Sequence, residues 1–162
     1  MRWLNHLFAF GAAQRRFPSA TLDAIQQAIA ASEGSHLGEI VFAVEGRLPL
    51  AALWCGVTPR QRAQAVFSDL RVWDTAHNSG VLIYLLLADQ AIEIVADRGI
   101  AARVDEAQWR DVCALMRGPF ARGEAQAGAL AGIAAVTEIL RRHLPAEELT
   151  NPDERPDRPV LL

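Results

Sequence analysis

The sequence contains no lysine, so all 16 of its basic side chains are arginines, and no basic run is longer than two residues. The 19 acidic side chains outnumber them and give a formal net charge of −3. Proteins that bind DNA or RNA through the phosphate backbone typically carry a basic patch or stripe. We therefore expect no nucleic-acid partner.

Cysteines and long apolar runs are also scarce. Two cysteines in 162 residues make neither a disulfide framework nor a Cys-x-x-Cys motif. The longest apolar region, residues 81–96, is interrupted by charged and polar side chains, which excludes a transmembrane helix. The first residues carry one cation, Arg2, and make a poor signal peptide. These absences favour a cytoplasmic protein, and the missing Gly-x-Ser-x-Gly and Gly-rich phosphate-binding motifs disfavour the common hydrolases and NTPases.

Hydrophobic residues make up 51% of the chain, and a chain of 162 residues has the usual size of one globular domain. We divide it into an N-terminal amphipathic helix over residues 1–16, an α/β domain over residues 17–145 and a flexible tail over residues 146–162. The tail is assigned because half of the eight prolines lie from Pro145 onward, among acidic and polar residues. It ends in a small apolar tip, residues 160–162.

The N-terminal helix carries its large apolar side chains on one face. These are Trp3, Leu4, Leu7 and Phe8. We expect this face to dock on the domain. An interfacial membrane anchor, flanked by Arg15 and Arg16, is the alternative.

Helical and strand patterns alternate along the domain. We predict helices over residues 19–32 with Ser19 as the cap, from a Thr58-Pro59-Arg60-Gln61 capping box, from Asp105 to Gly118-Pro119, and over residues 123–143. Strands are predicted over residues 39–45, 81–87 and 91–95, the last two as a hairpin. The fold class is therefore α/β: a small mixed sheet, two parallel strands plus an antiparallel hairpin strand, sandwiched between α-helices.

This topology brings polar residues to one edge of the sheet. Glu39 begins the first strand, Asp74 and Asn78 precede the second, and Asp97 follows the third. Carboxylate, amide and backbone oxygens are the ligands that Ca²⁺ and Mg²⁺ accept. The convergence predicts a divalent metal site.

Alternative interpretations stay open for each of these residues. Asp74 can cap a turn, Asn78-Ser79-Gly80 can be a tight turn, and Asp97-Arg98 can be a surface pair. Ligands of open α/β sheets also tend to bind at the opposite edge, where Glu45 and Asp89 lie.

The remaining candidate groups are better explained by packing or by loop polarity. Cys113 lies on the apolar face of a helix, and Cys55 has no base beside it in the sequence. His36 and His77 reach the candidate edge, where we interpret both as polar loop residues.

Four segments around this edge resemble the TPM domain family, whose members are also called TPM phosphatases. They are Gly38-Glu39-Ile40, Arg71-Val72-Trp73-Asp74, Asn78-Ser79-Gly80-Val81-Leu82-Ile83-Tyr84 and Ile94-Val95-Ala96-Asp97-Arg98-Gly99-Ile100. The resemblance covers about residues 17–145 and is to the short form without a signal peptide or transmembrane span. It implies a mixed sheet flanked by helices. It also implies relatives that include a thylakoid-lumen acid phosphatase, bacterial proteins that bind divalent metals, and proteins that assemble or maintain membrane complexes.

Carried over by position, the family's turn glycines correspond to Gly80 and Gly99, and its turn Asn and acidic residue to Asn78 and Asp97. Ser79 is inserted into the usual Asn-Gly turn, and Ala96 stands where many relatives have glycine. Many exported relatives also carry a Tyr-Gly version of the turn at Asp97, and this departure, like the one at Ala96, weakens the transfer of a phosphatase mechanism.

Two functions follow from these residues. The first is a non-catalytic module of a bacterial cytoplasm that binds Ca²⁺ or Mg²⁺ and acts in envelope or complex maintenance. Its protein or membrane-surface partner would meet the N-terminal helix and the apolar tip. The alternative is a metal-assisted phosphatase in which Asp74, Asn78 and Asp97 hold the metal ion, Glu39 assists, and Arg98 holds the phosphate.

Overall fold

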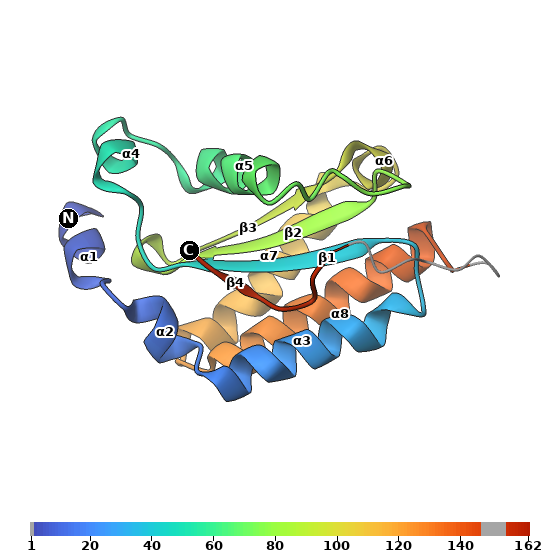
Figure 1. Ribbon diagram of the computed structural model, residues 1–162, viewed down its shortest axis with the longest axis horizontal. Helices are drawn as coiled ribbons and strands as arrows, with labels where there is room; N and C mark the ends of the chain where they lie inside the picture. The colour runs from blue at the N-terminus through green and yellow to red at the C-terminus, as the bar shows by residue number, and fades with distance from the viewer. Residues whose placement is uncertain (1, 147–154) are drawn as a thin grey trace.

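The computed structural model of the protein describes residues 2–146 and 155–162, which form a four-stranded mixed sheet between two layers of helices (Figure 1). The strand order is β3-β2-β1-β4. Strands β1 and β2 are parallel, β3 is antiparallel to β2, and β4 lies parallel to β1. The predicted α/β class and hairpin are thus confirmed. The strands are β1 (Glu39–Glu45), β2 (Gly80–Leu86), β3 (Ala91–Ala96) and β4 (Val160–Leu161).

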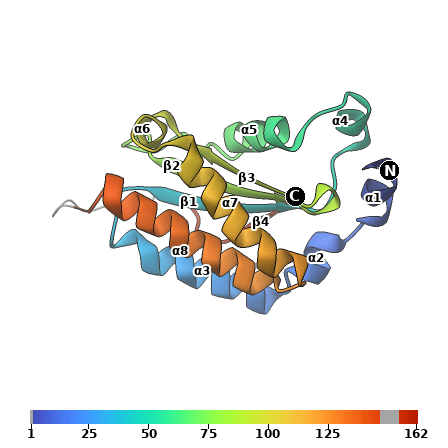
Figure 2. The same ribbon diagram turned by 180° about the vertical axis from the view of Figure 1, so that it is seen from behind.

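Three long helices cover one face of the sheet (Figure 2). They are α3 (Ser19–Glu33), α7 (Glu106–Ala121) and α8 (Ala125–His143). Small residues let α8 approach α7 closely, because a Cβ on Gly132 would lie 2.5 Å from the Met116 sulfur. Phe42 and Ile83 point into this larger core.

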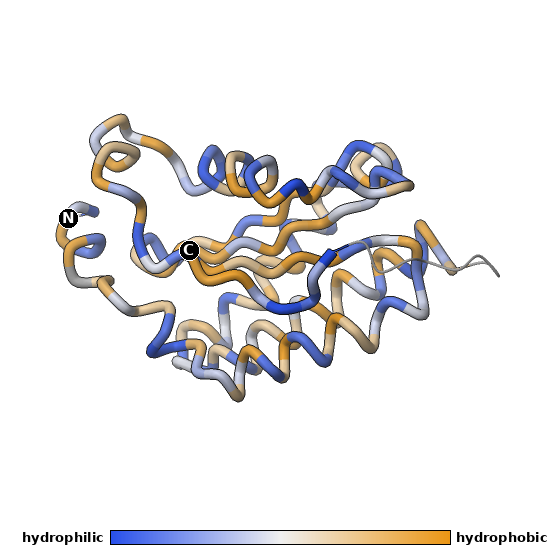
Figure 3. Tube along the Cα trace, in the orientation of Figure 1, coloured by the Kyte–Doolittle hydropathy of each residue, from blue (hydrophilic) through white to orange (hydrophobic). Residues whose placement is uncertain are grey.

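A thinner layer covers the opposite face. It consists of α5 (Pro59–Asp69) with the short helices α4 (Leu50–Trp54) and α6 (Arg98–Ala101) beside it (Figure 1). The predicted capping box starts α5, because the Gln61 N–H donates to Thr58 Oγ1 and the Thr58 N–H donates to Gln61 Oε1. Every residue of β1 and β2 is buried, in keeping with the largely apolar colouring of these strands in Figure 3.

Some predicted helix boundaries were wrong. Pro18, not Ser19, occupies the N-cap position of α3 and makes no side-chain cap. Helix α7 continues through Pro119 to Ala121, because a proline in the last turn removes a single backbone hydrogen bond. Helices α4 and α6 were missed, since five and four residues are too few to show a helical period.

The N-terminal region is two short helices rather than one. Helix α1 (Arg2–Phe8) and α2 (Ala12–Arg16) are separated at Gly11, whose φ is +67°. The expectation that the apolar face docks was also wrong, because Trp3, Leu4 and Leu7 are exposed, and the Phe8 side chain lies outside the described part of the structure.

Helix α1 is held through its polar face instead. Arg2 Nε and Nη2 donate to the carboxylate of Asp89, at 2.8–3.2 Å, and His6 Nε2 lies 3.1 Å from Asp89 Oδ1. The Leu48 N–H donates to His6 Nδ1 at 3.0 Å, so the ring proton sits on Nε2 and is donated to Asp89. His6 is buried although it is polar. Hydrogen bonds to Asp89 from a partly exposed Arg2 and a buried His6 thus set the orientation of α1.

The predicted flexible tail needs a similar correction at its end. Residues 147–154 of it lie outside the described residues. The apolar tip pairs with the sheet as β4, where Ala43 is opposite Val160 and the Leu162 N–H donates to Val44 O at 2.9 Å. No helix in the described part of the chain is both long and apolar enough to span a bilayer.

The loop that precedes β2 lies directly over the first residue of that strand. A Cβ on Gly80 would sit 1.9 Å from the Val72 carbonyl oxygen, a backbone atom that a side chain cannot push aside cheaply. Gly80 is therefore needed for this close approach, not for an unusual φ.

We expect Gly80→Ala to lower the free energy of unfolding by about 3 kcal/mol or more, because the loop must separate from the sheet. The matched control is Gly34→Ala, where the added Cβ meets nothing within 4 Å. Urea unfolding of both variants tests this, and equal losses of stability would contradict it.

The stability that the contact between α1 and Asp89 provides should depend on pH. Burial raises the pKa of Asp89, but the hydrogen bonds from Arg2 and His6 outweigh burial and hold that pKa below its ordinary value. Because the folded pKa is the lower one, the contact stabilises the protein fully at neutral pH, and the stabilisation is lost as the pH falls below about 4.

We therefore expect Asp89→Asn to cost about 2 kcal/mol at neutral pH and little in acid. Unfolding free energies of wild type and variant across this pH range are the measurement. Glu124→Gln breaks an exposed pair with Arg122 and serves as the control that changes little. A constant Asp89→Asn cost at all pH values would contradict the assignment.

Candidate functional site

Polar residues from three strand ends meet at the end of the sheet where α6 lies, opposite to α1 and α4 (Figure 1). Glu39 at the start of β1 is paired with Gly80 at the start of β2. On the other side of β2, the Asp97 N–H donates to Gly80 O at 2.8 Å. Because neighbouring residues of paired strands point to the same face, Glu39 and Asp97 flank Gly80 on one side of the sheet.

That side is the one covered by α5. Val41 lies two residues after Glu39, and Val95 lies two residues before Asp97. Both valines pack in the smaller core beneath α5. The Val72 carbonyl oxygen lies on the same side, over Gly80. Two carboxylates and a backbone carbonyl oxygen therefore face the same region.

Asp97 follows β3 and caps α6, and both roles follow from its sequence position. Its Oδ1 accepts the Arg98 N–H at 2.7 Å. The residue is 8% exposed, and its second oxygen, Oδ2, is buried with no hydrogen-bond partner among residues 2–146 and 155–162. A buried carboxylate oxygen without a donor is costly, so a partner for Oδ2 would stabilise the fold.

Glu39 is the second buried carboxylate of the site, at 2% exposure. It begins β1, where it is paired with Gly80 and its N–H donates to Ser79 O, in the loop that precedes β2, at 3.3 Å. Glu39 and Asp97 come from segments 58 residues apart in the chain, and the sheet register brings them to either side of Gly80.

Asn78 and Gly99 build the turn beside the carboxylates. Asn78 has a φ of +50°, and its backbone oxygen accepts the Gly99 N–H at 2.9 Å. A Cβ on Gly99 would lie 2.5 Å from His77 O and 2.6 Å from Asn78 O, so this turn requires glycine. The Asn78 side-chain oxygen accepts from Arg98 Nε and Nη2, at 3.2 and 3.1 Å. Arg98, predicted to hold a phosphate, is thus bound to Asn78.

Asp74 stands apart from the buried pair. Its side chain is 53% exposed, and Arg155 Nη2 donates to its backbone oxygen at 3.0 Å and lies 3.4 Å from its Oδ2. No sequence signal indicated Arg155, because its contact spans 81 residues. No group of three or more His, Cys, Asp or Glu side chains in the described part of the chain is arranged to hold a metal.

Histidine and cysteine add no nucleophile or base to this arrangement. His36 is fully buried near the edge, and burial holds its pKa below the ordinary value, so it is neutral at pH 7. His77 is exposed in the loop. Burial raises the pKa of the Cys113 thiol to about 11, as expected for a packing residue, while Cys55 is exposed.

The carboxylates at the opposite edge already have protein donors. Glu45 accepts from Arg62 Nε at 2.8 Å and from the Tyr84 hydroxyl at 2.6 Å. Burial is the main reason that the pKa of Tyr84 lies far above its usual range, so the hydroxyl keeps its proton. Asp89 accepts from Arg2 and His6. Neither carboxylate is available for a ligand without breaking an ion pair.

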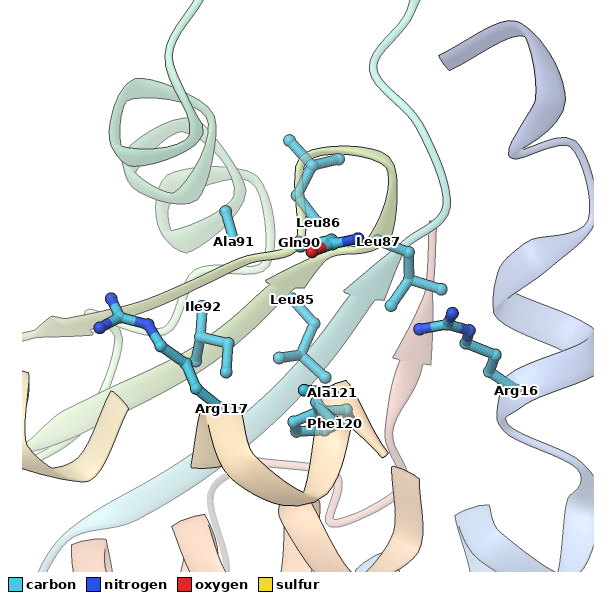
Figure 4. Close-up of a pocket in the computed structure, with 10 residues that line it drawn as sticks. All are labelled: Arg16, Leu85, Leu86, Leu87, Gln90, Ala91, Ile92, Arg117, Phe120 and Ala121. Carbon is cyan, nitrogen blue, oxygen red and sulfur yellow. The ribbon is translucent and has the colours of Figure 1, made fainter. Parts of the chain in front are cut away.

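A hollow of about 300 Å³ also lies at this opposite end (Figure 4). Arg16 and Arg117 flank an apolar floor that includes Leu85 and Phe120, and none of the residues that line the hollow is acidic. The hollow and the carboxylate pair therefore do not coincide. Divalent cations need oxygen ligands, so we place the candidate site at Glu39 and Asp97.

Comparison with known proteins gives one family and no curated relative. No curated protein matches the chain. The NMR structure of BA42, from the psychrophilic bacterium Bizionia argentinensis, is similar to this chain with a TM-score of 0.77 and 25% identity, over 90% of this chain and 95% of that one. A sequence profile of the TPM domain matches residues 14–139, a span that includes Glu39, Gly80 and Asp97. The chain therefore belongs to the TPM domain family.

Proposed function

We propose that this protein is a non-catalytic module that binds a divalent cation, Ca²⁺ or Mg²⁺, at the sheet edge formed by Glu39 and Asp97. One observation carries the proposal: Asp97 Oδ2 is buried and has no donor among the described residues. A cation would supply the missing positive partner. Asp97 would be the anchoring ligand.

The surrounding groups suit a hard cation. Carboxylates and backbone carbonyl oxygens are ordinary Ca²⁺ and Mg²⁺ ligands, and both ions also keep water molecules in their coordination shells. The Glu39 carboxylate and the Val72 carbonyl oxygen lie on the same face as Asp97. Asn78 and Asp74, whose side-chain oxygens already have arginine partners, would lie at the rim of the site.

The proposed role is structural rather than chemical. A cation at this edge would link the start of β1, the start of α6 and the loop before β2. Such a link could present that end of the domain to a partner in envelope or complex maintenance, which is the role that the family resemblance suggests.

The alternative is metal-assisted hydrolysis of phosphate esters at the same edge. It would need a phosphate-binding group, and Arg98 donates two hydrogen bonds to Asn78 instead. It would also need a base or a nucleophile. The histidines near this edge are His36, which is fully buried, and His77, which is exposed in the loop. We therefore favour binding over hydrolysis.

The test is titration of Asp97→Asn and wild type with Ca²⁺ and Mg²⁺. The asparagine keeps the Oδ1 cap of α6 but removes the charge, so the metal-free variant should fold with stability at least equal to wild type. At a cation concentration about a hundred times the dissociation constant, wild type should gain about 2.7 kcal/mol and the variant nothing. Thermal unfolding measures the gain.

Amide NMR supplies a second readout that needs no unfolding. We expect cation-dependent shifts at Glu39, Gly80 and Asp97–Gly99 in wild type, and none there in Asp97→Asn. Asp111→Asn, which removes an exposed carboxylate on α7, is the matched control and should respond like wild type. Unchanged wild-type spectra at millimolar cation would refute the site, and cation-dependent phosphatase activity that Asp97→Asn abolishes would replace binding by hydrolysis.

A further inference from the structure

The end of the molecule opposite to the candidate cation site exposes large apolar side chains. Trp54 is 82% exposed and Phe10 is 74% exposed, values far above those expected of residues that fold a core. Trp3, Leu7 and Leu50 are also exposed. They come from α1, from the residues that follow it and from α4, which lie at the same end in Figures 1 and 3. We call Trp3, Leu7, Phe10, Leu50 and Trp54 the aromatic end.

These side chains form one continuous surface. The Trp3 and Trp54 rings meet edge to face, with centroids 5.8 Å apart. Leu50 and Trp54 are four residues apart and share one face of α4. Phe10 and Leu50 line the same hollow, together with Leu162. The surface therefore extends over two helices and is not a set of isolated residues.

The exposed charges closest to the aromatic end are mostly positive, and the exposed carboxylate of Glu124, which lines a hollow with Arg15 and Arg16, is paired with Arg122. Arg47 lies over the Phe10 ring, 5.4 Å from its centroid, and Arg15 and Arg16 are exposed on α2. The ion pairs at this end join Arg2 to Asp89 and Arg62 to Glu45, and neither pair includes one of these three arginines. The two carboxylates are nearly buried, with 11% and 4% of their side chains exposed. The end is locally cationic although the whole chain carries −3.

The fold holds this surface outward. Helix α1 docks through Arg2 and His6, which leaves its neighbouring face, with Trp3 and Leu7, turned to solvent. A helix on a protein surface usually turns its apolar face to the core. The polar contacts of α1 therefore keep its part of the aromatic end exposed.

We propose that the aromatic end docks on the surface of an anionic lipid bilayer. Tryptophan side chains are enriched at the membrane interface, where an apolar ring and a polar N–H are both accommodated. Arginines beside them are attracted by anionic headgroups. An apolar face with a cationic border is the pattern of proteins that lie on a membrane without crossing it. The cation site at the other end of the sheet would then face away from the bilayer.

The experiment is co-sedimentation of the full chain with vesicles of phosphatidylcholine plus phosphatidylglycerol, and with vesicles of phosphatidylcholine alone. We expect binding to the first and much weaker binding to the second. Trp54→Ser should weaken binding by about tenfold or more, because it removes a large apolar side chain from the interface. Trp73→Ser, an exposed tryptophan at the other end of the sheet, is the matched control and should bind like wild type.

The charge requirement is tested separately. Replacing Arg15, Arg16 or Arg47 by glutamine should weaken binding to the anionic vesicles by about fivefold each. Arg141→Gln, on the distant end of α8, should have no effect. Higher salt should weaken the binding of wild type, since exposed charges are screened.

Three outcomes would overturn the proposal. They are absence of binding to anionic vesicles, equal binding of wild type and Trp54→Ser, and a dimer in solution that Trp54→Ser dissociates, which would assign the aromatic end to a second copy of this chain. Circular dichroism of each variant confirms that the fold is retained. None of these readouts uses a divalent cation, so they fail or succeed independently of the proposed cation site.

Discussion

Strand β2 is buried on both faces and paired along both edges, and this constraint organises the rest of the molecule. A strand with no solvent-facing side carries few polar side chains, and in β2 the hydroxyl of Tyr84 is satisfied by Glu45. Its polar neighbours are therefore displaced to its two ends. At the start, Gly80 lies between Glu39 and Asp97. Beyond its end, the turn to β3 carries Asp89, which receives α1. The polar environments at the two ends of the sheet therefore follow from one fully enclosed strand.

The carboxylates at the two ends differ in how their charges are satisfied. At the end near α1, Glu45 and Asp89 accept hydrogen bonds from arginines, and the ion pairs hold α5 and α1 in place. At the other end, Asp97 keeps one buried oxygen without a donor from the described residues. Protein charges thus complete the first pair of carboxylates. The cation of the proposed function would supply the partner that Asp97 Oδ2 lacks among the described residues.

Local patterns predicted the central elements well. The Thr58 capping box, the β-branched run of β1 and the short turn between β2 and β3 each depend on residues close in sequence, and each is present. The convergence of Glu39, Asn78 and Asp97 followed from the predicted strand order, which is a coarse property. Which of these side chains already has a partner could not be predicted. Only the folded structure shows that Arg98 donates to Asn78 and that Asp97 Oδ2 is buried.

The sequence by itself determined the α/β class, the parallel and antiparallel pairing of the first three strands and the edge at which the polar turns meet. Those features depend on the hydrophobic period and on turn residues, which are properties of short stretches of sequence. Tertiary structure alone decided that α1 docks by Arg2 and His6, that Val160 and Leu161 add a strand beside β1, and that Arg155 reaches Asp74. Each of these contacts joins segments more than 80 residues apart in the chain. Which residues meet over such a separation depends on the geometry of the whole fold. The same amphipathic pattern in α1 is compatible with either face inward, and the contacts of Arg2 and His6 with Asp89 select the polar face.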